Sequence, residues 1–198
     1  MGDATIRLSR LGFEKGTMLP AVAMAVLLAL PIGFWTGAEA LLGDSSATVS
    51  EGEEVTLVSI PGKTATLTVR VPSGTWKSSP ALNGGAVTLR QGATTISITV
   101  DGQVQSLGNL LERRAEAVTR GHSDLVATSF RQYEPEGAKR PGEQATLVGR
   151  DQGGAIVVTG NGKGAAATVV ALAPASQPAE RTLALVDSFT GLFGLEGK

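Results

Sequence analysis

The single histidine of the chain lies in a short polar motif, Gly121-His122-Ser123-Asp124. Serine, histidine and aspartate are the residue types of a hydrolase triad, in which the imidazole takes the proton of the hydroxyl nucleophile. Those groups must converge from separate segments, with base and nucleophile about 3 Å apart. Because consecutive residues on a turn point in different directions, the motif predicts a helix-terminal histidine followed by a loop. We therefore expect no catalytic residues, and a hydrolase is only a distant alternative.

A glycine-rich stretch, Gly160-Asn161-Gly162-Lys163-Gly164, contains the Gly-Lys pair of phosphate-binding loops. A phosphate loop also needs a glycine where this chain has Val157 and a serine or threonine where it has Gly164. The stretch lies between two expected strands, so no helix N-terminus is available to receive a phosphate. The spacing therefore predicts a hairpin turn.

Composition excludes several further kinds of chemistry. The chain has no cysteine and one histidine, which excludes thiol nucleophiles, disulfides and multi-histidine metal sites. The acidic residues Glu51, Glu53 and Glu54 lack the spacing of an EF-hand. A formal net charge of −1, from 17 basic and 18 acidic residues, gives no basis for nucleic-acid binding or for a polybasic membrane patch. We expect no metal, no cofactor and no nucleic-acid partner.

The N-terminal part carries a long apolar segment. No charged residue occurs from Gly16 to Ala38, an interval long enough to cross a hydrocarbon core of about 30 Å. Basic residues precede the segment and acidic residues follow it, so the positive-inside rule predicts a cytoplasmic N-terminus. Ala21, Ala25 and Ala29 recur at a four-residue spacing and form a candidate packing face for another transmembrane helix.

These features predict four parts of the chain: a cytoplasmic N-terminus (1–16), a transmembrane signal-anchor (17–41), a flexible tether (42–54) and an extracytoplasmic domain (55–198). The predicted localisation is the cell membrane, with a single pass and the domain outside. The alternative is a cleaved signal peptide, because Ala38-Glu39-Ala40 matches a small-residue cleavage site. Cleavage near Ala40 would release a secreted domain.

The domain itself shows short runs rich in valine, isoleucine and threonine. The clearest alternation begins at Thr66 and places Leu67, Val69 and Val71 on one face, which is typical of an antiparallel sheet with one wet side. Eight strands are predicted: Val55–Ile60, Thr66–Val71, Ala86–Arg90, Thr95–Val100, Val126–Gln132, Ala145–Arg150, Ala155–Thr159 and Ala166–Ala173.

Two segments change to helical spacing. Ser106 is a plausible N-cap for a helix that Gly121 ends, and Ala179 to Phe189 forms the second helical stretch, with Phe193 and Leu195 as a continuation of its apolar stripe. The predicted fold class is therefore α+β, an antiparallel sheet of about seven or eight strands with two packed helices, preceded by one N-terminal transmembrane helix.

The order of elements resembles the Mog1/PsbP-like fold family. The likeness rests on a strand that closes with Val-Pro-Ser-Gly-Thr-Trp at Val71 to Trp76, a mid-chain helix, the meander that follows it, and a terminal helix ending in Asp187-Ser188-Phe189. It covers about Val55 to Phe189, and the tether in front of it is similar to that of actinobacterial membrane-anchored members of the LpqN type. Such domains are generally non-catalytic accessory or binding modules, so the resemblance implies no catalytic residues.

Two places in the domain are candidate contact sites. The longest polar connection begins at Tyr133, and its candidate interaction residues are Tyr133, Glu134, Glu136, Lys139 and Arg140. A candidate apolar groove between sheet and helices would be lined by Leu107, Leu111, Val186 and Phe189. For Trp76 we expect core packing beside a strand end.

The expected function is that of a non-catalytic, membrane-anchored accessory protein. Its expected partners are the membrane and an integral membrane protein or envelope complex. The alternative is an extracytoplasmic carrier that holds a lipid or small molecule between sheet and helices.

Overall fold

A computed structural model describes residues 46–59, 64–81, 84–134, 142–191 and 193–197. The predicted signal-anchor and its alanines Ala21, Ala25 and Ala29 lie outside these residues, and no helix within them is long and apolar enough to span a membrane. The elements are β1 (Ala47–Val49), β2 (Glu54–Val58), β3 (Ala65–Arg70), β4 (Trp76–Pro80), β5 (Ala86–Gln91), β6 (Thr94–Asp101), α2 (Leu107–Gly121), β7 (Val126–Tyr133), β8 (Gly142–Val148), β9 (Gln152–Gly160), β10 (Ala166–Pro174), α3 (Ala179–Thr190) and β11 (Phe193–Gly197).

The strands form two antiparallel sheets rather than the single sheet expected from the sequence. The large sheet has eight strands in the order β1-β4-β5-β6-β10-β9-β8-β7. The small sheet has three strands in the order β11-β3-β2. The α+β class, the antiparallel pairing and the two helices are confirmed.

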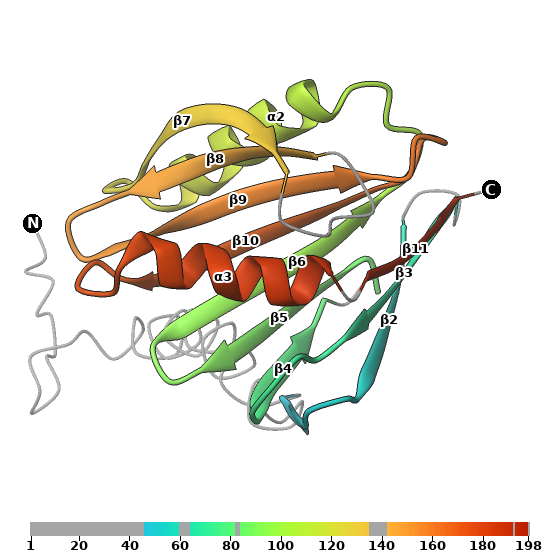
Figure 1. Cartoon of the computed structure of the whole chain (residues 1–198), viewed down its shortest axis with the longest axis horizontal. Coiled ribbons are helices and arrows are strands. Elements are labelled where there is room, and N and C mark those ends of the chain that lie inside the picture. Colours follow the sequence, from blue (N-terminus) through green and yellow to red (C-terminus); the bar gives the residue numbers. More distant parts are fainter. Residues whose placement is uncertain (1–45, 60–63, 82–83, 135–141, 192, 198) are drawn as a thin grey trace, which may run out of the picture. The chain divides into compact units, whose positions relative to one another are not determined.

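The large sheet is covered differently on its two faces. Alternate residues of β9 show this, because Val157 belongs to the core shared with α3 and the small sheet, whereas Ile156 and Val158 pack against α2. Figure 1 shows α3 in front of β9 and β10 and α2 behind β7 and β8. The middle of the sheet is therefore buried on both sides, and the outer positions of β4 and β5 stay partly exposed.

Trp76 anchors the larger of the two cores, as expected from its place at a strand end. Its side chain is buried, and its ring packs edge-on against Phe189 of α3, with ring centroids 5.5 Å apart and an interplanar angle of 80°. The Trp76 indole N–H donates to the carbonyl of Ser73 at 2.9 Å, which satisfies its only polar atom. The hydrogen bond to Ser73 and the ring contact with Phe189 together link the β3–β4 connection to α3.

Three strands were not expected. Residues 47–49 form β1 and pair with β4, so the prediction of a flexible tether through residue 54 was wrong over this part. Strand β4 has the polar sequence WKSSP, in which only Trp76 and Ser78 face the core. Phe193 and Leu195 do not continue the stripe of α3, because they lie in β11, which pairs with β3.

The helix α2 begins and ends as the sequence predicts. The Ser106 hydroxyl accepts from the backbone N–H of Asn109 at 3.3 Å, which is the expected N-cap contact. Leu110, Leu111 and Ala115 are buried against the sheet, and Leu107 and Val118 are partly buried beside them. This stripe fixes α2 over β8 and β9.

Candidate functional site

The large hydrophobic side chains that the structure leaves most exposed gather on one hairpin. Among the described residues, Val126 is 60% exposed, Phe130 51% and Val148 53%. All three lie on β7 and β8, and β7 is an edge strand of the large sheet. Val126 and Val148 are cross-strand partners, and because the adjacent Ala127 and Leu147 pack under α2, these two valines face the other side of the sheet. An edge strand presents unpaired backbone groups, and exposed apolar residues beside it are typical of an interaction site.

A β-bulge in β7 sets the direction of Phe130. Thr128 pairs with Thr146 and Arg131 with Gln144, so two residues of β7 lie opposite the single residue Ala145. Ser129 has φ of 53°, which is uncommon for a residue other than glycine and accommodates the extra residue. Since Ala145 packs in the core under α2, the bulge places Phe130 on the α2 side of the sheet.

Phe130 there lines an open groove of about 470 Å³ between α2 and β7. Ala115, Leu125 and Ala127 contribute apolar surface, and the α2 residues Glu112, Glu116 and Thr119 complete the lining. Glu116 bonds to Arg120 at 2.5 Å, whereas no ion pair involves Glu112 within the described part of the chain. The groove therefore combines apolar surface with a partly unneutralised acidic side.

Tyr133 was expected to be an exposed contact residue, and this prediction was wrong. Its side chain is buried at the end of β7, and its hydroxyl lies 2.6 Å from Asp187 Oδ1 and 2.7 Å from Thr190 Oγ1. The phenol donates to the Asp187 carboxylate, so Tyr133 fastens the edge strand to α3. Glu134 is exposed, and Glu136, Lys139 and Arg140 lie outside the described residues.

Replacing Tyr133 with phenylalanine is expected to lower the free energy of unfolding by about 1–2 kcal/mol, because it removes a hydrogen bond to a carboxylate while keeping the ring. Urea unfolding of the full chain in detergent measures the change. Asp187→Asn, which keeps an acceptor for the phenol, should cost less. Equal losses in the two variants would contradict this role for the hydroxyl.

The same hydroxyl predicts a pH dependence. Burial, the hydrogen bond to Asp187 and the charge of that carboxylate raise the pKa of Tyr133 above its usual value of 10.0. The phenol then stays neutral in the folded chain at a pH where the unfolded chain ionises it. The resulting stabilisation is present below pH 10.0 and is lost as the pH rises toward the higher folded pKa. Above pH 10.0, the free energy of unfolding should therefore fall more steeply with pH in the wild type than in Tyr133→Phe.

The candidate apolar groove does not form as expected. Leu107 and Leu111 belong to the core under α2, whereas Val186 and Phe189 belong to the core under α3. The large sheet separates the two pairs, because neighbouring residues of β9 face opposite cores. The structure therefore does not bring these four side chains together in one groove.

The two polar motifs whose residue types could do chemistry, around His122 and at 160–164, make hydrogen bonds that hold local structure. The His122 ring nitrogen Nδ1 lies 3.1 Å from the carbonyl oxygen of Val118, in the last turn of α2. In the β9–β10 connection, Asn161 Oδ1 accepts from the N–H groups of Lys163 and Ala165 at 2.8 and 3.1 Å, which confirms the predicted hairpin turn. Over the ranges that the structure describes, no three His, Asp or Glu side chains gather as metal ligands.

No protein-family model and no curated protein matches the chain. Among solved structures, the chain is similar to the solution structure of cyanobacterial PsbP (CyanoP) from Synechocystis sp. PCC 6803, with a TM-score of 0.47 and 12% sequence identity. The match covers 78% of this chain and 95% of that chain. This similarity concerns the backbone alone, and the LpqN-type part of the resemblance stays a prediction.

Proposed function

We propose that the protein is a non-catalytic, membrane-anchored accessory protein whose domain binds a membrane or envelope protein. The long uncharged segment from Gly16 to Ala38 and its charge asymmetry support the anchor and the external position of the domain. The β7–β8 hairpin supports the binding role.

The observation that carries the proposal is the exposed apolar edge. The three most exposed large hydrophobic residues of the described chain share the β7–β8 hairpin, and Phe130 adds its ring to the apolar surface of the groove beside α2. Phe130 lies at a groove with an acidic side, which fits a partner segment that presents an apolar side chain beside a basic one. Phe130 is the expected anchor because aromatic residues dominate the energy of interfaces.

Copurification from membranes in mild detergent tests this binding role. Phe130→Ser should reduce the recovered partner at least tenfold, since truncation of an interface anchor costs about 2 kcal/mol or more. Glu112→Lys should also reduce it, because the substitution reverses the charge of the groove where a basic side chain is expected.

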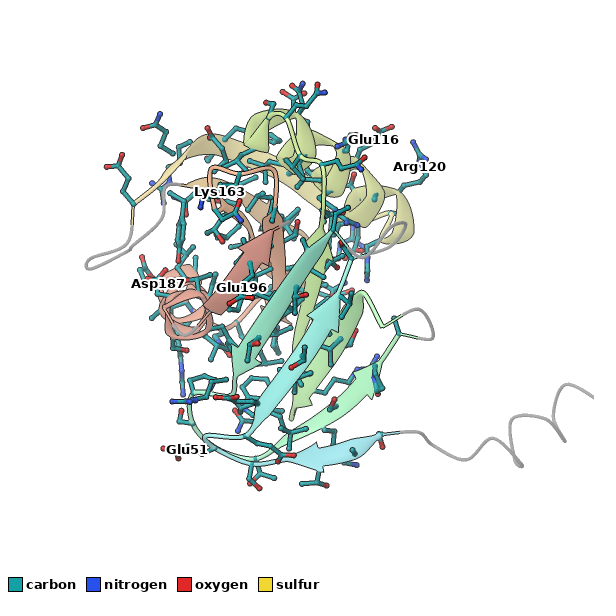
Figure 2. The ribbon with its side chains drawn as sticks, turned by 90° about the vertical axis from the view of Figure 1, so that its right-hand side faces the viewer. Glu51, Glu116, Arg120, Lys163, Asp187 and Glu196 are labelled. Atoms are coloured by element: carbon teal, nitrogen blue, oxygen red, sulfur yellow. The ribbon has the colours of Figure 1, made fainter. Side chains whose placement is uncertain are left out.

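Glu196→Lys provides a matched control for the charge reversal. Glu196 is exposed on β11, and Figure 2 shows it away from Glu116 and Arg120 of α2. The variant makes the same change in net charge and should leave partner recovery unchanged. Equal losses for Glu112→Lys and Glu196→Lys would contradict binding at the groove. Recovery of a bound lipid without a protein partner would favour the carrier alternative.

A further inference from the structure

Two basic side chains lie together on the outward face of the large sheet. Lys77 of β4 and Arg90 of β5 are paired residues, and both are exposed. Arg90 is also in register with Thr95 of β6 and through it with Leu172 of β10, which packs on the α2 side. Because paired residues point to the same side of a sheet, both cations project from the face that bears α2.

The surroundings of this pair are hydroxyl-rich and contain little negative charge. The adjacent cross-strand row is Ser79, Thr88 and Ser97, and the hydroxyls of Thr88 and Ser97 lie 3.2 Å apart. The acidic residue of these three strands, Asp101, bonds to Arg114 at 2.7 Å. No ion pair involves Lys77 or Arg90 in the part of the chain that the structure describes. We refer to Lys77, Ser79, Thr88, Arg90 and Ser97 as the basic face.

The length of chain before the domain limits how far this face can lie from a membrane. The expected membrane segment ends at residue 41, and β1 begins at Ala47. The five residues 42–46 reach at most about 18 Å when fully extended. Strand β1 pairs with β4, and β4 pairs with β5, so the basic pair lies only about 5–10 Å further across the sheet.

We propose that the basic face binds the anionic phospholipid headgroups of the membrane in which the chain is anchored. The proposal rests on the membrane anchor of the proposed function. Ammonium and guanidinium groups attract phosphate, and the serine and threonine hydroxyls can donate hydrogen bonds to its oxygens. Within a screening length of a bilayer rich in anionic lipid, each cation favours contact by about fivefold, so the two together favour it by about 30-fold.

The nearby acidic turn does not oppose this contact. Glu54 bonds to Arg70, and Glu53 accepts from the backbone N–H of Ser50. Figure 2 shows Glu51 on the same side as Asp187 of α3, away from Glu116 and Arg120 of α2. The basic face points to the α2 side, so the domain can turn Lys77 and Arg90 toward the bilayer with Glu51 directed away. Glu112 and Glu116 of α2 lie on this same side, where Glu116 is paired with Arg120 and the exposed Arg113 adjoins Glu112 in sequence.

The absence of cysteine makes a direct test possible, because any introduced cysteine is the single labelling site. Ser79→Cys places a fluorophore on the basic face, and Ala184→Cys places it on the exposed side of α3, on the opposite face. Each full-length variant is inserted into nanodiscs that contain a headgroup-spin-labelled lipid as quencher. The discs are made of phosphatidylcholine alone or of an equal mixture with phosphatidylglycerol.

In the mixed discs, we expect several-fold stronger quenching of the fluorophore at position 79 than at position 184. Adding Lys77→Gln/Arg90→Gln should lower the quenching at position 79 to the level seen in discs of phosphatidylcholine alone. Raising the ionic strength from about 0.1 M to about 1 M should have the same effect, because the screening length falls from about 10 Å to about 3 Å. The matched control Arg150→Gln/Lys163→Gln removes two other exposed cations and should leave the quenching unchanged.

Two kinds of result would overturn the proposal, and they distinguish a failure of the basic face from a failure of the membrane anchor. Equal quenching at both positions, or no effect of Lys77→Gln/Arg90→Gln, would refute the basic face while the anchored chain remains in the discs. Failure of the full chain to stay in the discs, with an N-terminus processed near Ala40, would refute the anchor, and the basic face proposal falls with it.

Discussion

Replacement of Phe189 with alanine is expected to lower the free energy of unfolding by about 3–5 kcal/mol, the range for removing a fully buried aromatic side chain. Phe189 is completely buried, and its ring packs against Trp76 at a centroid distance of 5.5 Å. The substitution leaves a cavity between α3 and the strand end that holds Trp76. Because domains are stable by only about 5–15 kcal/mol, this single change removes a large share of the total.

Urea unfolding of the full chain in detergent, followed by Trp76 fluorescence in a Trp35→Phe background, measures this effect. Phe130→Ala is the matched control, because it deletes the same ring from a site where half of the residue is exposed. The control should cost about 1 kcal/mol. Similar losses in the two variants would show that Phe189 is not the aromatic centre of the core.

Gly154→Ala is expected to disrupt the pairing of β9 with β10. A Cβ atom at position 154 would overlap the backbone carbonyl of Ala171, which is held in the β9–β10 ladder and cannot move aside as a side chain would. Overpacking that forces backbone shifts commonly costs 1–3 kcal/mol or more, and this contact is with backbone on a strand buried on both faces. We expect a loss of at least about 3 kcal/mol.

Gly153→Ala is the control for this prediction, one residue along the same strand. Its Cβ would lie 3.2 Å from the carbonyl oxygen of Leu147, a tight contact that calls for a shift of a few tenths of an ångström, whereas the contact at position 154 is a direct overlap. Amide hydrogen exchange and thermal unfolding should show a large loss for Gly154→Ala and a small one for Gly153→Ala. Comparable stability in both variants would contradict the close approach of β9 to β10.

The sequence predicts the central elements because their patterns are local. The stripe of α2 and the glycine-rich turn between β9 and β10 depend on residues close together in the chain. The strands that escaped prediction have weak patterns of their own. Strand β4 has one large apolar residue, Trp76, and β11 has glycine at two of its five positions. Strand β11 forms because the distant strand β3 offers an open ladder, and β4 forms because β5 and β1 pair with its two edges.

The candidate site likewise has features that the local sequence predicts and features that depend on distant parts of the chain. The strand Val126–Gln132 is predictable from its composition, but its position at the edge of the sheet follows from the order of eight strands. The sequence gives little sign of the bulge at Ser129, and the bulge decides that Phe130 faces α2. Tyr133 ends the same strand, and its contact with Asp187 spans 54 residues of sequence, so the sequence alone could not separate a buried tyrosine from an exposed one.

Site-specific crosslinking in native membranes shows whether the groove between α2 and β7 binds a membrane or envelope protein. The full-length chain carries a photoreactive amino acid either at Phe130, in the groove between α2 and β7, or at Glu196, on the exposed side of β11. We predict a discrete adduct with one membrane or envelope protein from position 130, lost when Glu112→Lys is added, and no such adduct from position 196. Identical adducts from both positions, or none from position 130, would contradict the assignment of this edge as the binding surface.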